Sequence, residues 1–433
     1  MIWKIEFHIA MKMTKTRKNP MVVWAQINWR KLERAVYKLQ KRIYQASSRG
    51  DVKVVRKLQK TLLNSWSAKM LAIRQVRIDY QAQQLLIKLA LEPEWEAKFE
   101  PHSYGFRPGK TYMAPILAIK EAIRYGSKYV LSANLAQHFE QIDHEKLLSK
   151  INTFPKLRRQ IRVGMKSGVY NLNSWLLNQE ITHPGSLLSP LLVNIALHGM
   201  EKIVREYGKT ILGKKEEITL IRHGSEFALL DSEFDVIIKA KILIEKFLGD
   251  LGIQINLDQT LISHTWKKGT KSPGFNFLDF NIRQYGIKTH SQPQRYETFI
   301  QPSQEAIKTH YGELAQEIDK FKSCQSQLDL IKRLSPIITR WSNYYFPVNS
   351  AKTFQKLDHL MTLKLIAWVK ARHNHKSTKQ WVEKYFGSKD QANWVFRAFE
   401  ESQPVYLTYH HGFFNAVKQC DTYTKTSTPK WYS

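Results

Sequence analysis

Residues 220–230, LIRHGSEFALL, contain two apolar runs separated by His-Gly-Ser-Glu. A Gly-Ser pair between strand-forming runs predicts a two-residue β-hairpin, because Gly224 can adopt the positive φ that the first turn position requires. Such a hairpin directs the chain into an antiparallel sheet. The sequence therefore predicts a sheet-containing fold in which His223, Gly224, Ser225 and Glu226 form the tip of a hairpin.

The charge of the chain is far higher than solubility requires. Its 433 residues include 67 Lys and Arg against 37 Asp and Glu, which gives a formal charge of +30 at pH 7. Such an excess of cations indicates a polyanionic partner. The 43% hydrophobic content is typical of a folded protein. The 12 Trp, 19 Tyr and 20 Phe favour nucleic acid over an anionic bilayer, because disordered basic tails contain few aromatic residues.

Cysteine usage and hydrophobic runs bear on the compartment. Cys324 and Cys420 are isolated and far apart, so they form neither a CxxC pair nor a zinc site, which fits a reducing compartment. No run of about 18 apolar residues occurs, and charges interrupt the N-terminal segment where a signal peptide would have its apolar core. We expect a protein of the bacterial cytoplasm or of an organelle interior that is neither secreted nor membrane-bound.

Two amphipathic helices are predicted in the N-terminal part. Between residues 32 and 46, apolar residues recur every three or four positions, and cations occupy other positions of the turn. Gly50 provides a stop and Asp51 an N-cap for a second helix rich in Lys and Arg. The cations of the first helix form either a solvated face or, in a chain of this charge, a surface for RNA or DNA. The candidates for that surface are Arg34, Lys38, Lys41 and Arg42.

A further strand is predicted at residues 128–135 (KYVLSANL), followed by a turn and a helix at residues 139–151. Asn134 then lies at the end of a strand, where α+β catalytic domains often place their reactive groups. Together with the hairpin tip at Gly224 and Ser225, this arrangement is compatible with a polymerase-like palm. Periodicity alone does not establish one.

Four segments resemble successive blocks of the group II intron reverse transcriptase and maturase family, in the family's order. They are residues 27–63, 89–109 (LALEPEWEAKFEPHSYGFRPG), 189–202 (SPLLVNIALHGMEK) and 340–358 (RWSNYYFPVNSAKTFQKLD). The resemblance implies an α+β fold. It would comprise a right-hand polymerase-like body, with truncated fingers and an antiparallel palm sheet, and then a helical thumb and a maturase domain that binds intron RNA.

The resemblance places the family's catalytic positions on residues of different chemistry. In the family the hairpin tip reads Tyr-Ala-Asp-Asp, and another aspartate ends the preceding palm strand. That aspartate falls on Asn134, the Tyr-Ala pair on His223 and Gly224, and the hairpin aspartates on Ser225 and Glu226. Nucleotidyl transfer uses two divalent metals about 4 Å apart, and Mg²⁺ requires anionic oxygens there. We therefore expect no catalytic residue and no metal site.

Two further departures concern nucleotide and template handling. The family's Pro-Gln-Gly-Gly segment falls on residues 183–186, His-Pro-Gly-Ser. The chain also passes directly from residue 76 to residue 83, where the family has several dozen residues of fingers strands. One alternative stays open at this point, namely that Glu140, Asp143 and Glu226 form a replacement carboxylate cluster in a divergent active polymerase.

Residues 340–384 combine positive charge with aromatic rings. They include nine Lys and Arg against two acidic residues. Cations for phosphates and rings for unstacked bases are what recognition of structured RNA requires. A subset recurs at helical spacing and is assigned to the core: Phe354, Leu357, Met361, Leu365 and Trp368. The candidate RNA-binding residues of this segment are Arg340, Tyr344, Tyr345, Lys352, Lys356, Lys370, Arg372, Lys376 and Lys379.

The resemblance also implies a domain order. We expect a leader at residues 1–20, an N-terminal helical RNA-binding extension at 21–78, degenerate fingers and palm at 79–300, a helical thumb and maturase domain at 301–400, and a tail at 401–433. Many family members continue into an endonuclease whose metal site uses paired Cys and His. Cys420 has no such partner in the sequence, so an endonuclease is not expected.

The sequence thus predicts a catalytically inactive, reverse-transcriptase-like maturase that binds structured, group II intron-type RNA and assists its folding and splicing. The expected partner is that RNA, without a small-molecule substrate or a membrane. No cofactor is expected other than the Mg²⁺ that the RNA carries. Two alternatives remain: a divergent active RNA-directed DNA polymerase, and an RNA-binding scaffold subunit of another ribonucleoprotein.

Overall fold

The computed structural model describes residues 27–76, 79–135, 139, 141–166, 187–210, 218–253, 262–266, 273–287, 295–321, 326–373, 384–389 and 392–412. These residues form two compact units that meet in sequence between Ser263 and His264. The expected division between palm and thumb after residue 300 does not coincide with this boundary. Among the described residues, no helix is long and apolar enough to cross a membrane.

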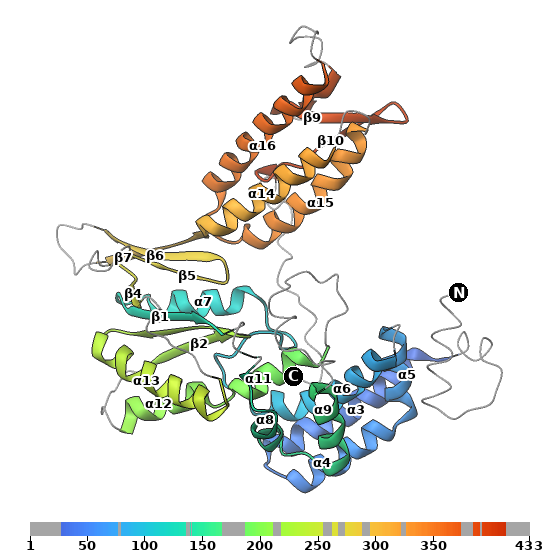
Figure 1. Cartoon of the computed structure of the whole chain (residues 1–433), viewed down its shortest axis with the longest axis vertical. Coiled ribbons are helices and arrows are strands. Elements are labelled where there is room, and N and C mark those ends of the chain that lie inside the picture. Colours follow the sequence, from blue (N-terminus) through green and yellow to red (C-terminus); the bar gives the residue numbers. More distant parts are fainter. Residues whose placement is uncertain are drawn as a thin grey trace. The chain divides into compact units, whose positions relative to one another are not determined.

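The described part of the first unit begins with four helices (Figure 1). They are α3 (Trp29–Ser48), α4 (Val52–Asn64), α5 (Trp66–Gln75) and α6 (Asp79–Glu96). Gly50 has a φ of +74°, and Asp51 Oδ1 accepts a hydrogen bond from the Val54 N–H at 3.0 Å. The predicted helix stop and N-cap between α3 and α4 are therefore confirmed.

These four helices share one hydrophobic core. The predicted apolar face of α3 is confirmed, since Leu32, Val36, Ile43 and Ala46 are buried. α6 packs against α3, α4 and α5, and its buried Ala82, Leu86 and Ala90 belong to the same core. Residues 21–78 alone would therefore leave this core open, because the extension expected from the sequence ends before α6 begins.

The sheet of the first unit has the strand order β2-β3-β1-β4. Its strands are β1 (Tyr129–Asn134), β2 (Thr219–His223), β3 (Glu226–Asp231) and β4 (Ile262–His264). β2 and β3 are antiparallel, and His223 pairs with Glu226 across a two-residue turn, which confirms the predicted hairpin. β1 is antiparallel to β3, so Asn134 lies opposite Glu226. This pairing brings the end of β1 to the hairpin tip.

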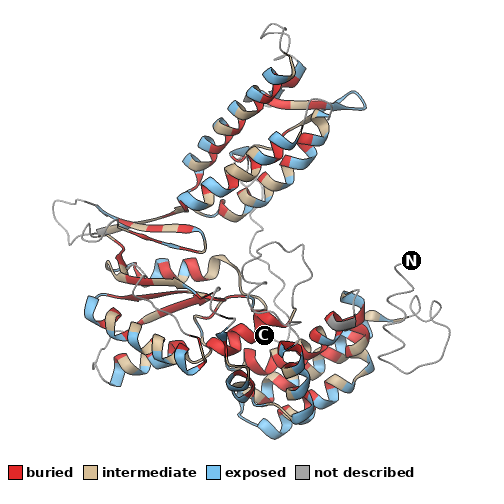
Figure 2. Ribbon diagram, in the orientation of Figure 1, coloured by how far each residue is buried: buried red, intermediate tan, exposed pale blue. Residues whose placement is uncertain are grey.

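Helices cover the sheet. α7 (Met113–Ala122), α12 (Met200–Thr210) and α13 (Phe234–Asp250) pack against its strands (Figure 1). The unit also contains α8 (His144–Ile151), α9 (Pro155–Lys166) and α11 (Ser189–Leu197). Buried residues gather on the strands and on α11 (Figure 2). Every residue of α11 is buried, as expected of a helix that is apolar on all sides.

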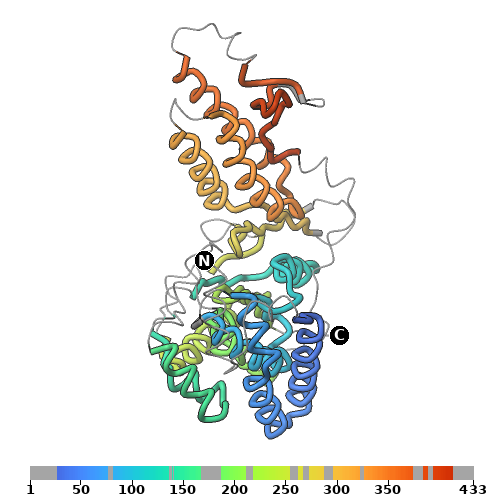
Figure 3. Tube along the Cα trace, turned by 90° about the vertical axis from the view of Figure 1, so that its right-hand side faces the viewer, coloured from blue at the N-terminus to red at the C-terminus, as the bar shows by residue number. Residues whose placement is uncertain are grey.

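The described residues of the second unit form two three-stranded antiparallel sheets and three helices. The first sheet has the order β5-β6-β7, with β5 (Phe275–Phe277), β6 (Phe280–Ile287) and β7 (Arg295–Pro302). α14 (Gln304–Lys320) packs against both α15 (Gln327–Tyr345) and α16 (Ala351–Arg372) (Figure 3). The predicted core positions of α16 are confirmed, because Phe354, Leu357, Met361, Leu365 and Trp368 are all buried.

The sequence analysis predicted a helical thumb and a maturase domain at residues 301–400 and named no strands there. A second sheet follows α16, with β8 (Phe386–Lys389), β9 (Ala392–Glu400) and β10 (Gln403–Tyr406) in the order β10-β9-β8. In β9, residues 396–399 are buried, half-buried, buried and exposed in turn, which is the period-two pattern of a half-buried strand, and Val395 before them is buried as well. This pattern was available in the sequence and was overlooked.

A buried polar network holds the segment after β10 onto the helices. Asp358 of α16 accepts hydrogen bonds from the backbone N–H groups of His410 and His411 at 2.8 and 3.0 Å, and its carboxylate lies 2.6 Å from Nδ1 of each ring. The Nε2 atoms of His410 and His310 are 2.8 Å apart. His310 also stacks on Trp341, with ring centres 4.5 Å apart, and its burial lowers its pKa to about 3.

Candidate functional site

The hairpin tip and the end of β1 form one cluster, as the sequence predicted. Gly224 has a φ of +62°, which permits the tight turn. The Ser225 hydroxyl donates a hydrogen bond to Asn134 Oδ1 at 3.1 Å, and Glu226 pairs with Asn134 across the strands. Two neutral side chains are thus hydrogen-bonded to each other, at positions that the family resemblance aligns with metal-binding aspartates.

The replacement cluster considered from the sequence is not assembled by the described residues. Asp143 is the N-cap of α8, and its Oδ1 accepts from the backbone N–H groups of Glu145 and Lys146 at 2.8 and 3.1 Å. Glu140 and residues 183–186 lie outside the described residues. Within the described part of the chain, no group of three or more His, Cys, Asp or Glu side chains could hold a metal ion. Asn134 and Ser225 do not fit the two Mg²⁺ ions of a polymerase.

The loop of residues 102–107, HSYGFR, lies directly on the hairpin. The Tyr104 N–H donates to the Arg222 carbonyl at 2.8 Å, and the Arg222 N–H donates to the His102 carbonyl at 2.9 Å. Gly105 approaches so closely that an added Cβ would lie 2.0 Å from Gly224 N. The Phe106 ring lies against Gly224 and 5.2 Å from the His223 ring. The sequence offered Gly105 as a signal, but its contact with the hairpin was not foreseen.

Arg222, directly before the tip, is fully buried and ties the loop to the hairpin. Its guanidinium donates to the Gly224 carbonyl and to Asn194 Oδ1, both at 2.9 Å, and to Ser103 Oγ at 2.6 Å. Asn194 of α11 in turn donates to the Gly105 carbonyl at 2.6 Å. Burial lowers the pKa of Arg222 to about 10, so it remains a cation at neutral pH. The hydrogen bonds replace the water that a buried guanidinium loses.

Gly105→Ala is expected to destabilise the protein by about 1 to 3 kcal/mol, because backbone atoms cannot move aside as a flexible side chain can. Gly126→Ala is the matched control, since nothing lies within 4 Å of its added Cβ. Urea unfolding followed by circular dichroism measures both variants. Equal stability of the two variants would contradict the close loop–hairpin contact.

His223, at the hairpin tip, gives the stability a dependence on pH. Burial lowers its pKa to about 4, below the ordinary value of about 6.5. Between pH 4 and 6.5 the unfolded chain binds a proton at this residue that the folded chain does not. The stabilisation that neutral His223 gives the folded state is therefore complete above pH 6.5 and is lost as the pH falls toward 4. In wild-type protein the unfolding free energy should fall as the pH decreases from 6.5 to 4. We expect this slope to be smaller in His223→Gln, by up to about 1.4 kcal/mol per pH unit.

Urea unfolding at several pH values between 4 and 7 measures this effect, and His359→Gln, at an exposed position of α16, is the control. An unchanged slope in His223→Gln would show that His223 titrates normally in the folded protein.

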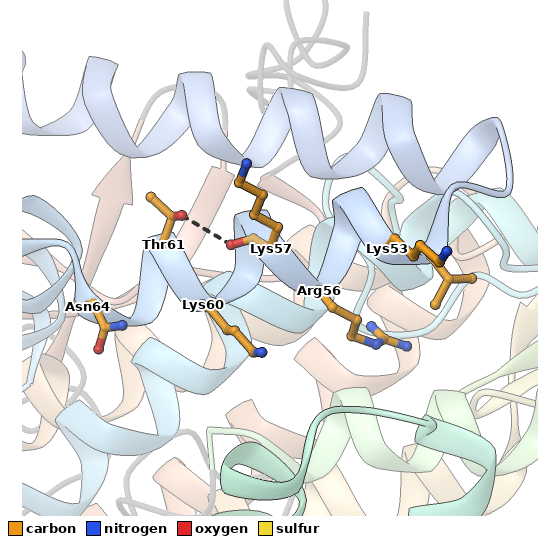
Figure 4. Close-up of a pocket in the computed structure, with 7 residues that line it drawn as sticks. Lys53, Arg56, Lys57, Lys60, Thr61 and Asn64 are labelled. Atoms are coloured by element: carbon orange, nitrogen blue, oxygen red, sulfur yellow. Dashed lines mark hydrogen bonds between the residues drawn. The ribbon is translucent and has the colours of Figure 1, made fainter.

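The N-terminal helices present two cationic surfaces. Arg34, Lys38 and Arg42 of α3 are exposed and Lys41 is half-buried, in agreement with the predicted basic face. A groove of about 560 Å³ runs along α4 and is lined by Val52, Lys53, Arg56, Lys57, Lys60, Thr61 and Asn64. Arg56 and Lys60 extend to the same side of the helix (Figure 4).

Two of the cations that line the groove have partners on neighbouring elements. Arg56 is anchored by Glu94, at 2.5 Å, and by the carbonyl of Asn152, while Lys60 Nζ lies 5.2 Å from the centre of the Phe154 ring. Lys53 and Lys57 are exposed along the rim. The sequence predicts that this helix is basic, but its lysines were not among the predicted RNA-binding residues.

Six of the nine candidate residues of the second unit belong to α16 or follow it in sequence. Lys352, Lys356 and Lys370 are exposed on α16, and Lys370 follows Lys352 by about five helical turns, on the same side of the helix. Arg372 is half-buried, with its guanidinium carbon 4.2 Å from the centre of the Trp368 ring. Lys376 and Lys379 lie outside the described residues.

The other three candidates belong to α15. Arg340 is exposed and pairs with Glu313 at 3.4 Å. The prediction that Tyr345 is a surface ring is wrong, because only 3% of it is exposed and its ring packs 5.0 Å from that of Phe280. Tyr344 is half-buried, stacks on the same Phe280 ring at 5.1 Å and donates to the Leu278 carbonyl at 3.2 Å. Both tyrosines therefore join α15 to the β5–β6 turn.

Comparisons with known proteins agree with this architecture. The profile of the N-terminal domain of reverse transcriptase matches residues 24–84, that of reverse transcriptase (RNA-dependent DNA polymerase) residues 63–282, and that of the group II intron maturase-specific domain residues 307–386. The second match alone covers half of the chain.

The alignments with individual relatives cover different shares of this chain. Maturase-like protein 1 of Euglena gracilis is 23% identical over 397 residues, 73% of this chain and 76% of the relative. Group II intron-encoded protein LtrA of Lactococcus lactis subsp. cremoris is 32% identical over 123 residues, 27% of this chain, and the match spans only 20% of LtrA. The three family models match in sequence order, and the reverse transcriptase match includes the sheet in which the hairpin tip meets β1. The chain therefore belongs to the group II intron reverse transcriptase and maturase family.

Proposed function

We propose that the protein is a maturase without polymerase activity, which binds structured, group II intron-type RNA and stabilises its active fold. One observation carries the proposal. It is the 3.1 Å hydrogen bond between Ser225, at the hairpin tip, and Asn134, at the end of β1. Two neutral groups that satisfy each other have little affinity for a hard divalent cation. The maturase-specific match at residues 307–386 indicates the activity that remains.

In this proposal the protein contributes binding free energy, and the RNA supplies its own chemistry and Mg²⁺. The α3 face and the α4 groove form an N-terminal RNA-binding extension that includes α6. The sheet and its helices are a degenerate fingers and palm, and the second unit is the thumb and maturase region. The net charge of +30 supports an RNA partner, because phosphate neutralisation dominates such affinities.

A salt titration tests whether the exposed lysines of α16, Lys352 and Lys370, contact RNA phosphates. If Lys352 and Lys370 contact phosphates, the affinity for intron RNA falls with salt, and Lys352→Gln combined with Lys370→Gln flattens the log–log slope by about one to two units. Lys239→Gln, at an exposed lysine of α13, is the control and should leave the slope unchanged. Filter binding between low and physiological salt measures both slopes. A double variant with the wild-type slope would place the RNA on another surface.

The same experiment separates the alternatives. Binding of any RNA with equal affinity, whether folded or not, would favour a scaffold subunit of another ribonucleoprotein. Binding only of primer–template duplexes would favour a divergent polymerase.

A further inference from the structure

The outward face of the β8–β10 sheet carries aromatic and cationic side chains that no site described above uses. In β9, Phe396 and Ala398 are buried, whereas Phe399 is 52% exposed. α15 packs against β9, and Gln327 Nε2 donates to the Arg397 carbonyl at 2.9 Å. Since side chains alternate between the two faces of a strand, Arg397 and Phe399 lie on the face opposite to Phe396 and Ala398. Val395 shares this face and is buried, Arg397 is half-buried, and Phe399 is the exposed member.

Arg397 is half-buried and packs beside Phe399 and Gly387. Its guanidinium carbon is 5.2 Å from the centre of the Phe399 ring. A Cβ added to Gly387 of β8 would come within 2.6 Å of Arg397 Nη1, so the glycine makes room for the guanidinium. Tyr406 of β10 pairs with Arg397, and its hydroxyl donates to the Ser388 carbonyl at 3.0 Å. Phe399, Arg397 and Tyr406 together are called the β9 platform.

We infer that the β9 platform stacks one or two unpaired bases of a single-stranded RNA segment. A nucleobase is a flat π system, and both a phenyl ring and a guanidinium plane offer it a stacking surface that tolerates any sequence. The inference rests on the proposed RNA-binding function and adds a site beyond the maturase-specific match, which ends at residue 386.

Charge supports RNA as the occupant. The guanidinium of Arg397 lies within the platform, and a cation beside a stacking ring attracts the phosphates on either side of the base. Glu400, the acidic residue next to Phe399, is paired with Lys332 at 2.5 Å. The pairing offsets the repulsion that this carboxylate would exert on a phosphate backbone.

The test uses full-length protein and a short single-stranded oligoribonucleotide with one 2-aminopurine, whose fluorescence is quenched by stacking. We expect quenching on binding. Phe399→Leu should weaken binding about 5- to 150-fold, the equivalent of about 1 to 3 kcal/mol for a stacked base, without changing the salt slope. Phe399→Trp should retain binding. The control is Tyr125→Leu in the other unit, a ring that is 86% exposed with Arg124 at 5.3 Å.

Wild-type affinity and quenching in Phe399→Leu would overturn the inference, and salt-dependent binding of folded intron RNA by the same protein would leave the proposed function in place. Failure of wild-type protein to bind either RNA would overturn both. A Phe399→Leu variant with altered sedimentation but unaltered RNA affinity would identify a second copy of the chain as the occupant, which also contradicts the inference.

Discussion

Full-length protein is expected to extend no primer above a control without protein when it is supplied with template, deoxynucleotides and Mg²⁺ or Mn²⁺. Two-metal catalysis requires anionic ligands on both sides of the reacting phosphate. The structure instead places an amide and a hydroxyl, bonded to each other at 3.1 Å, at two of the three positions. Primer extension resolved on a denaturing gel measures the activity.

Asn134→Asp combined with Ser225→Asp is expected to remain inactive as well. α5 ends at Gln75 and α6 begins at Asp79, so the chain has no room there for the fingers strands that the family resemblance implies. Circular dichroism should confirm that the double variant is folded. Extension by wild-type protein that Glu226→Ala abolishes would identify a divergent polymerase, and activity in the double variant would show that triphosphate binding survives the short connection.

The second large effect concerns cooperation between the cationic surfaces of α3 and α16. Two weak contacts with one rigid RNA reinforce each other through effective concentration, by about 10² to 10⁴ in affinity. We therefore expect loss of either surface to weaken binding of folded intron RNA by about that factor, and to have much less effect on unstructured RNA of equal length. Full-length variants are the proper test, because a fragment of residues 21–78 would lack the α6 part of its core.

Matched triple substitutions to Gln provide the comparison, and electrophoretic mobility shifts measure affinity. The α3 set is Arg34, Lys38 and Arg42, and the α16 set is Lys352, Lys356 and Lys370. The control set takes exposed lysines from other helices: Lys120, Lys146 and Lys239. Equal losses on folded and unfolded RNA would point to a non-specific basic scaffold.

Features that depend on neighbouring residues were predictable. The Gly50 stop, the Asp51 N-cap and the Gly224 turn each follow from the φ or the hydrogen bond that one residue type provides, and the structure has all three. The core row of α16 also follows from helical spacing, because residues three and four apart share one helix face. The family resemblance implied that Asn134 lies beside the hairpin tip, and in the structure Asn134 pairs with Glu226.

Features that depend on distant contacts were not predictable. An aromatic residue beside cations looks the same in sequence whether it faces water or another element, so Tyr345 was assigned to the surface although Phe280 buries it. The loop at Gly105 is a second case, since its partner Gly224 is remote in sequence and only the folded backbone shows their approach.

The sequence by itself determined the α3–α4 helix pair, the core row of α16, the hairpin at Gly224 and the cationic character of this protein, because each of these is a property of single residues or short-range spacing. That Asn134 and Ser225 stand at aspartate positions is what the family resemblance implies. The tertiary structure decided which cations and rings are available to a partner. It showed that Asn134 and Ser225 bond to each other, and that Arg397 and Phe399 lie on an outward sheet face. Exposure and hydrogen-bond partners follow from the packing of segments remote in sequence, which local patterns do not encode.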